Sequence, residues 1–182
     1  MNKKILLSIS FIALISAIGL WGFSGQNITK SKPVSYGSAS WVRNYADINE
    51  LFDGADVIVE GKAKSIKSYM IQNSPNTDVS FSVKKWHKGS DNKSRNEITV
   101  IQDGGEINGV IYKLDQVETM ESGKEYILFL KYDSNTDHYY VLTGWQGLYK
   151  LGLFNAENSD SNRTMPKDKL LKTLSEKSLK TK

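Results

Sequence analysis

The sequence predicts an all-β domain, a small sandwich or barrel of five to seven strands, with one short helix before it and another after it. Short apolar runs recur at spacings of about 10 to 15 residues, and several of them alternate apolar and polar residues. Clusters of Gly, Asn, Asp and Ser separate these runs. No helical pattern lies between consecutive strands, which argues against a parallel sheet built from βαβ units.

The first 25 residues predict a signal peptide or a membrane anchor. Lys3 and Lys4 precede an uncharged run from Ile5 to Phe23. That run fits a signal peptide, and as a helix it is also long enough to cross about 30 Å of hydrocarbon. Lysines before the run place the rest of the chain outside the cell. We therefore expect an extracytoplasmic protein, either secreted or membrane-anchored, and the sequence leaves both alternatives open.

Residues 26–40 are polar and contain Pro33 and Gly37, which is typical of a linker. From Trp41 to Phe52 the apolar residues fall at helical spacing, so a short amphipathic helix is expected there, ending at Gly54. We expect this helix to open a barrel domain that spans residues 41–155.

Four segments predict strands in the first part of this domain. Asp56 to Ile66 alternates apolar and charged residues, and Gly61 interrupts it in the way that a β-bulge or a barrel bend does. Val79, Phe81 and Val83 alternate with polar residues, as expected of a half-buried strand. The runs 98–101 and 110–114 predict two more strands, on either side of paired glycines.

Residues 121–151 predict the central hairpin, because two apolar runs, 126–130 and 139–142, enclose the polar stretch Asp133 to Asp137. This stretch has the spacing with which a calcium-binding loop begins. However, His138 stands where that loop needs Gly, and Gly144 stands where it needs a bidentate Glu. A turn accounts for the residues fully, since Asp, Asn and Ser favour turns.

Residues 156–182 predict a loop followed by a basic helix that begins at Pro166. Leu170, Leu171 and Leu174 share one face of this helix. Two arrangements are open. The leucines can pack on the barrel, or the helix can lie on an anionic membrane surface.

The chemistry-bearing residues give no indication of catalysis. The chain has no cysteine, which excludes disulfides, thiolate metal sites, cysteine nucleophiles and a lipid-modified N-terminal cysteine. Asp103 and Glu106 with a histidine, His87 or His138, form the only hydrolase hypothesis that the sequence offers. We expect a protein that is not an enzyme, with no cofactor, no catalytic residues and no metal ligands.

Partner predictions rest on charge and aromatic residues. A basic stretch surrounds Trp86, whereas the charged residues between positions 97 and 125 are mainly acidic. The candidate ligand face consists of Lys85, Trp86, Trp145 and Tyr149. We expect an unknown protein or surface polymer as partner and no nucleic acid, with the membrane as a further partner through the N-terminal segment if that segment is not cleaved.

The chain resembles a group of poorly characterised bacterial exported domains with an OB-like, TIMP-like β-barrel. The resemblance covers residues 45–154 and rests on the segments 55–61, 83–89, 104–105, 123–130 and 144–147. It implies an OB-like barrel and transfers no catalytic residue. TIMP-like inhibitors use an N-terminal cysteine, which this chain lacks. The expected function is a non-enzymatic extracytoplasmic binding domain; the alternative is an inhibitor or accessory protein of an exported enzyme.

Overall fold

The computed structural model describes residues 31–38, 43–89 and 95–180. The chain divides into residues 1–31 and residues 32–182, and every element below belongs to the second unit. The predicted signal or anchor segment, residues 1–25, lies outside the described residues. Within the described ranges, no helix is both long enough and apolar enough to cross a membrane.

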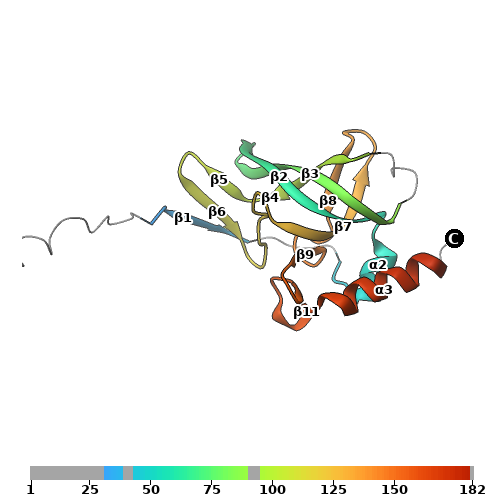
Figure 1. The fold of residues 1–182 in the computed structure, drawn as a ribbon. Helices are drawn as coiled ribbons and strands as arrows, with labels where there is room; N and C mark the ends of the chain where they lie inside the picture. The colour runs from blue at the N-terminus through green and yellow to red at the C-terminus, as the bar shows by residue number, and fades with distance from the viewer. Residues whose placement is uncertain (1–30, 39–42, 90–94, 181–182) are drawn as a thin grey trace, which may run out of the picture. The chain divides into compact units, whose positions relative to one another are not determined.

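The second unit is mostly β-sheet with a C-terminal helix, which confirms the predicted all-β class (Figure 1). In chain order the elements are β1 (Val34–Gly37), α2 (Ile48–Gly54), β2 (Val57–Ile71), β3 (Ser74–Lys88), β4 (Glu97–Asp103), β5 (Gly105–Ile107), β6 (Val110–Leu114), β7 (Glu125–Asp133), β8 (His138–Val141), β9 (Leu148–Leu151), β10 (Asn155–Glu157), the 3-10 helix η2 (Ser161–Arg163), β11 (Met165–Pro166) and α3 (Lys167–Lys180).

The longest pairing joins β2 and β3 in an antiparallel hairpin that turns at Gln72 and Asn73, both of which have positive φ. The pairing register shifts between Glu60 and Gly61, which confirms that the strand is interrupted at Gly61 as predicted. A Cβ at Gly61 would lie 2.1 Å from the carbonyl oxygen of Ser82 on β3. Glycine is needed here because the two backbones approach closely.

The larger sheet has the strand order β11-β10-β9-β7-β2-β3-β4-β8, and β8 also pairs with β7. β8 runs antiparallel to β7, which confirms the predicted central hairpin, and parallel to β4. The β4–β8 ladder contains only the pairs Val100–Tyr139 and Ile101–Tyr140. The strand order therefore returns to β7, but through a short ladder.

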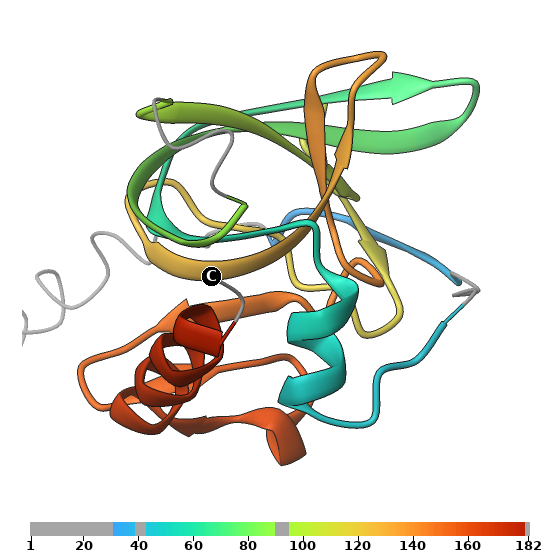
Figure 2. The ribbon, with the colours of Figure 1, turned by 90° about the vertical axis from the view of Figure 1, so that its right-hand side faces the viewer.

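Two apolar cores lie on opposite faces of β2 and β7. Val59 and Leu128 point into one core, whereas Ile58 and Phe129 point into the other, and none of these four side chains is exposed. Because both faces are covered, the apolar residues 126–130 follow one another without alternation. The second core is covered by α2 and α3, which Figure 2 shows on the same side of β7.

α3 packs its leucines on the domain. Leu170 and Leu174 are fully buried in the second core, and Leu171 is partly buried against it. The first of the two predicted arrangements is therefore the one found, and these leucines are not available to a membrane. Lys177 on α3 also forms an ion pair with Asp53, with 3.1 Å between Nζ and Oδ1, which joins α3 to α2.

The helix that precedes β2 is shorter than the sequence predicts. The apolar spacing predicts a helix from Trp41, whereas α2 begins at Ile48 and residues 43–47 are not helical. The side chain of Asp47 accepts hydrogen bonds from the backbone N–H groups of Asn49 and Glu50, as an N-cap does. The cap fixes the start of the helix, and the preceding residues are held by other contacts.

A smaller sheet has the order β1-β6-β5. Its outer strand, β1, comes from residues that the sequence predicts to be linker. It pairs in parallel with residues 111–114 of β6, and all four of its residues are exposed. Backbone hydrogen bonds rather than side-chain burial hold this strand.

Candidate functional site

The loop between β8 and β9 carries Trp145 in a compact set of turns. Thr143 and Gly144 both have positive φ. The Trp145 N–H donates to the Thr143 carbonyl at 2.7 Å, and the Gly147 N–H donates to the Leu142 carbonyl at 3.1 Å. A Cβ at Gly147 would lie 2.5 Å from the Phe129 carbonyl oxygen. Gly144 and Gly147 thus let the loop turn tightly against β7.

Gln146 holds this loop in place through a network of buried hydrogen bonds. Its side chain accepts from the Tyr45 N–H at 3.0 Å and from the Thr143 hydroxyl at 3.2 Å. Its amide nitrogen donates to the Tyr45 carbonyl at 3.2 Å and to the Asn44 side chain. Gln146 is not exposed, so these partners satisfy an amide that would otherwise be costly to bury.

A second loop, residues 158–163, closes against the first. The Asn158 amide donates to the carbonyls of Trp145, Gln146 and Leu148, which ties the two loops together. Asp160 caps η2 by accepting from the Asn162 N–H at 2.9 Å. The buried Asn158 and the cap at Asp160 thus hold the loop in a fixed conformation, which positions its remaining side chains.

Arg163 stands against the indole of Trp145. Its guanidinium carbon lies 5.6 Å from the centre of the ring, within cation–π range. The same side chain lies 3.7 Å from the Asp160 carboxylate and donates to the Tyr45 carbonyl. Only 13% of the Arg163 side chain is exposed, so it is a fixed positive charge rather than a mobile surface group.

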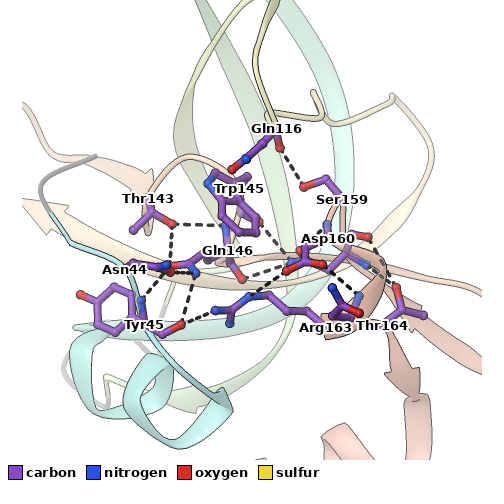
Figure 3. Close-up of polar contacts among 12 residues, drawn as sticks. Asn44, Tyr45, Gln116, Thr143, Trp145, Gln146, Ser159, Asp160, Arg163 and Thr164 are labelled. Carbon is purple, nitrogen blue, oxygen red and sulfur yellow. Dashed lines mark hydrogen bonds and ion pairs between the residues drawn. The ribbon is translucent and has the colours of Figure 1, made fainter. Parts of the chain in front are cut away.

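These loops and the residues after β6 surround a pocket of about 360 Å³, here called the Trp145 pocket (Figure 3). Its lining consists of Gln116, Trp145, Ser159, Asp160 and Ser161. The hydroxyl of Ser159 donates to the Gln116 carbonyl at 2.8 Å, which holds the two walls together. The indole Nε1 of Trp145 is buried and has no hydrogen-bond acceptor within the described part of the chain.

The Trp145 pocket combines an aromatic ring with several hydrogen-bonding side chains. The carboxylate of Asp160 accepts hydrogen bonds, and the serine hydroxyls and the Gln116 amide both donate and accept. A ligand rich in hydroxyl groups needs such a mixture. The pocket has little net charge, because the positive charge of Arg163 lies beside the negative charge of Asp160.

Of the four residues of the predicted ligand face, only Trp145 lies in this pocket. Lys85 and Trp86 line a separate cavity of about 120 Å³ between β3 and α3, together with His87 and Ser178. Tyr149 is 1% exposed and packs against Phe129 with 5.8 Å between ring centres. Tyr149 therefore belongs to the second core and cannot meet a ligand at the surface.

Sequence patterns did not identify Gln116, Ser159, Asp160, Ser161 or Arg163. Gln116 has positive φ in a loop, and the other four residues lie in a stretch that is typical of any polar loop. The one usable signal was Asp160, since Asp followed by Ser and Asn is typical of a cap. Nothing in the sequence places these residues next to Trp145.

The residues of the hydrolase hypothesis are engaged elsewhere. Glu106 forms an ion pair with Lys32 at 2.6 Å, and His87 lies 3.4 Å from Glu60. Asp103 lines a cavity of about 150 Å³ that includes Tyr140, and burial raises the pKa of its carboxyl. The geometry gives this hypothesis no support.

The Asp133 to Asp137 stretch forms the β7–β8 turn. Asp133 accepts from the Asn135 N–H and the Thr136 hydroxyl, both at 2.9 Å, and Asp137 binds Arg95 and the Tyr132 hydroxyl. These contacts are those of a turn. In the described residues no group of three or more His, Asp or Glu side chains is placed to hold a metal ion.

His87 gives a prediction for the dependence of stability on pH. Burial, and secondly Lys85, lowers its pKa, although Glu60 acts in the opposite direction. In the unfolded chain the His87 imidazole is protonated near pH 6.5, whereas in the folded chain it is protonated only at lower pH. This contribution to stability is present above about pH 6.5 and is lost as the pH falls below it.

We therefore expect the free energy of unfolding of the wild type to fall more steeply below pH 6.5 than that of His87→Gln. Urea unfolding at a series of pH values measures this difference. His138→Gln is the control for removing a histidine elsewhere. An identical pH dependence for the wild type and His87→Gln would contradict the prediction.

No family model matches the chain, and no curated protein matches its sequence.

Proposed function

We propose that this protein is a non-enzymatic extracytoplasmic binding domain, secreted or tethered to the membrane by its N-terminal segment. In this proposal its ligand is a hydroxyl-rich molecule, such as a saccharide unit of a surface polymer, held in the Trp145 pocket. The observation that carries the proposal is the Trp145 pocket itself, in which an aromatic side chain lies beside the hydrogen-bonding side chains of Asp160, Gln116 and two serines.

The proposal includes an OB-like barrel formed by β2, β3, β4, β8 and β7. The strand order supports it, because it runs from β7 through β2, β3, β4 and β8 and back to β7. OB-type barrels are five-stranded and partly open. The two-pair ladder between β4 and β8 agrees with a barrel that is partly open at this position.

The chemistry of the pocket favours a neutral hydroxylated ligand over a charged polymer. Asp160 and Arg163 lie 3.7 Å apart and largely cancel each other's charge at a distance. Each can still hydrogen-bond to a hydroxyl group at close range. Buried polar groups that a ligand satisfies contribute more to selectivity than to bulk affinity.

The test uses sedimentation of the protein with isolated cell walls, with free mono- and disaccharides as competitors. We expect Asp160→Asn to weaken binding about tenfold, because a hydrogen bond to a charged group contributes about 1.5 to 3 kcal/mol. The asparagine still caps η2, so folding should be retained. Trp145→Phe, which makes the aromatic side chain of the pocket smaller and removes the indole N–H, should weaken binding as well.

The matched control is Trp86→Phe, which changes a tryptophan in the other cavity of the predicted ligand face. Binding to cell walls should be unchanged in this variant and should depend little on salt. The proposal is contradicted if Trp86→Phe loses binding while Trp145→Phe retains it. It is also contradicted if salt alone releases the protein and no saccharide competes.

A further inference from the structure

The turn between β9 and β10 exposes two large apolar side chains. Leu153 is 82% exposed and Phe154 is 77% exposed. The Gly152 N–H donates to the Asn155 carbonyl at 2.8 Å, so both residues occupy the centre of a tight turn. Gly, Asn, Asp, Pro and Ser normally occupy such positions, because they adopt turn geometry easily.

The fold itself does not explain these two residues. Leu153 and Phe154 belong to neither apolar core. Single exposed apolar side chains are ordinary on protein surfaces, but two consecutive ones at the tip of a turn are unusual. Pro166 adds to the same surface, since it is exposed and pairs with Asn155. Leu153, Phe154 and Pro166 are called the apolar tip below.

Lysines stand beside the apolar tip. The backbone N–H of Lys167 donates to the Phe154 carbonyl at 2.8 Å, so the first turn of α3 adjoins the β9–β10 turn. Figure 2 shows the start of α3 next to this turn. Lys169 is exposed on the same helical turn, and the acidic neighbours are Asp168 on α3 and Glu157 on β10.

We propose that the apolar tip inserts into a lipid bilayer, at the boundary between the headgroups and the acyl chains. Apolar side chains beside basic ones suit this boundary, where the lysines meet anionic headgroups. A turn with two exposed apolar side chains also suits a fluid bilayer, because a bilayer needs no preformed pocket of complementary shape. This surface is separate from the Trp145 pocket and does not depend on it.

The length of the chain before β1 supports a bilayer as the occupant. The apolar run that the sequence predicts as a signal or anchor ends at Phe23, and β1 begins at Val34. A link of that length spans at most about 35 Å when fully extended. In the tethered form, the domain therefore stays close to the bilayer at all times. Insertion of the tip then costs little translational freedom.

The test takes advantage of the absence of cysteine, which allows a single introduced cysteine to be labelled alone. Leu153→Cys in the full chain is labelled with an environment-sensitive dye. The protein is reconstituted into vesicles of phosphatidylglycerol and phosphatidylcholine in equal parts. Asn135→Cys, in the exposed β7–β8 turn, is the matched control.

We expect blue-shifted emission at position 153 and quenching by spin-labelled lipid roughly threefold stronger than at position 135. Lys167→Gln with Lys169→Gln should reduce the quenching at 153. Equal quenching at both positions, or none at 153, overturns the proposal. A blue shift without vesicles that grows with protein concentration also overturns it, since it indicates a second copy as the occupant. Phe154→Cys repeats the measurement if Leu153→Cys does not fold.

Discussion

Gly61→Ala is expected to destabilise the domain severely, by about 3 kcal/mol or more, at the upper end of the cost of overpacking a core. The new Cβ would lie 2.1 Å from the Ser82 carbonyl oxygen and 2.7 Å from the ring of Phe81. Neither neighbour can yield easily, because one is backbone and Phe81 is fully buried. Urea unfolding of the purified variant measures the loss.

The matched control for this prediction is Gly152→Ala in the β9–β10 turn. A Cβ there would approach the Asn155 carbonyl oxygen no closer than 3.3 Å, a distance that a small shift accommodates. Gly152→Ala should therefore change stability by less than about 1 kcal/mol. If both variants lose stability equally, the effect arises from the unfolded chain and the close approach of β2 to β3 is not its cause.

Gln146→Ala is expected to cost about 2 to 4 kcal/mol, because it leaves buried hydrogen-bonding groups without partners. The Tyr45 N–H loses its acceptor, while the Tyr45 carbonyl keeps Arg163 as a donor. Thermal unfolding should show the loss. Ligand binding in the Trp145 pocket should also weaken, because Gln146 supports the loop that carries Trp145.

Gln146→Glu gives a sharper form of this test. At position 146 the new carboxylate would be buried next to the carbonyl of Tyr45 and the side chain of Asn44. Burial disfavours its charged form, so the folded-state pKa of Glu at this position lies above the unfolded value of about 4.3. The variant should approach wild-type stability at lower pH, where the protonated group can donate. Its deficit should grow as the pH rises through the folded-state pKa. A deficit that does not change with pH would contradict the role given to the network.

The sequence was sufficient to predict those parts of the fold that depend on local patterns. The alternation at Val79 and Phe81, the interruption at Gly61 and the leucine face of α3 each report on one strand or one helix, and each was confirmed. The predicted start of α2 was wrong. Apolar residues before Asp47 have helical spacing, but the side chain of Asp47 caps the helix, so α2 begins only at Ile48.

The pocket could not be predicted in the same way. It depends on the 158–163 loop folding back onto the β8–β9 loop through Asn158, and on Gln146 reaching Asn44 and Tyr45 far away in the sequence. Such contacts leave no periodic signal. Tyr149 was predicted to lie on the ligand face and does not. An aromatic residue near two glycines suggests an exposed loop, but Tyr149 lies on β9 with its side chain buried in the second core.

The second core also has a consequence for the order in which the chain can fold. Ile58 and Phe129 are covered by Leu170 and Leu174, which come more than a hundred and about forty residues later in the chain. A chain that emerges from its N-terminus first has made every strand of the larger sheet before α3 exists. Until α3 follows, the second core is covered by α2 but not by Leu170 and Leu174, and its exposed apolar residues resemble those of intermediates that aggregate readily. Completion of the native state therefore waits for the last helix of the described chain, whichever strands have already paired.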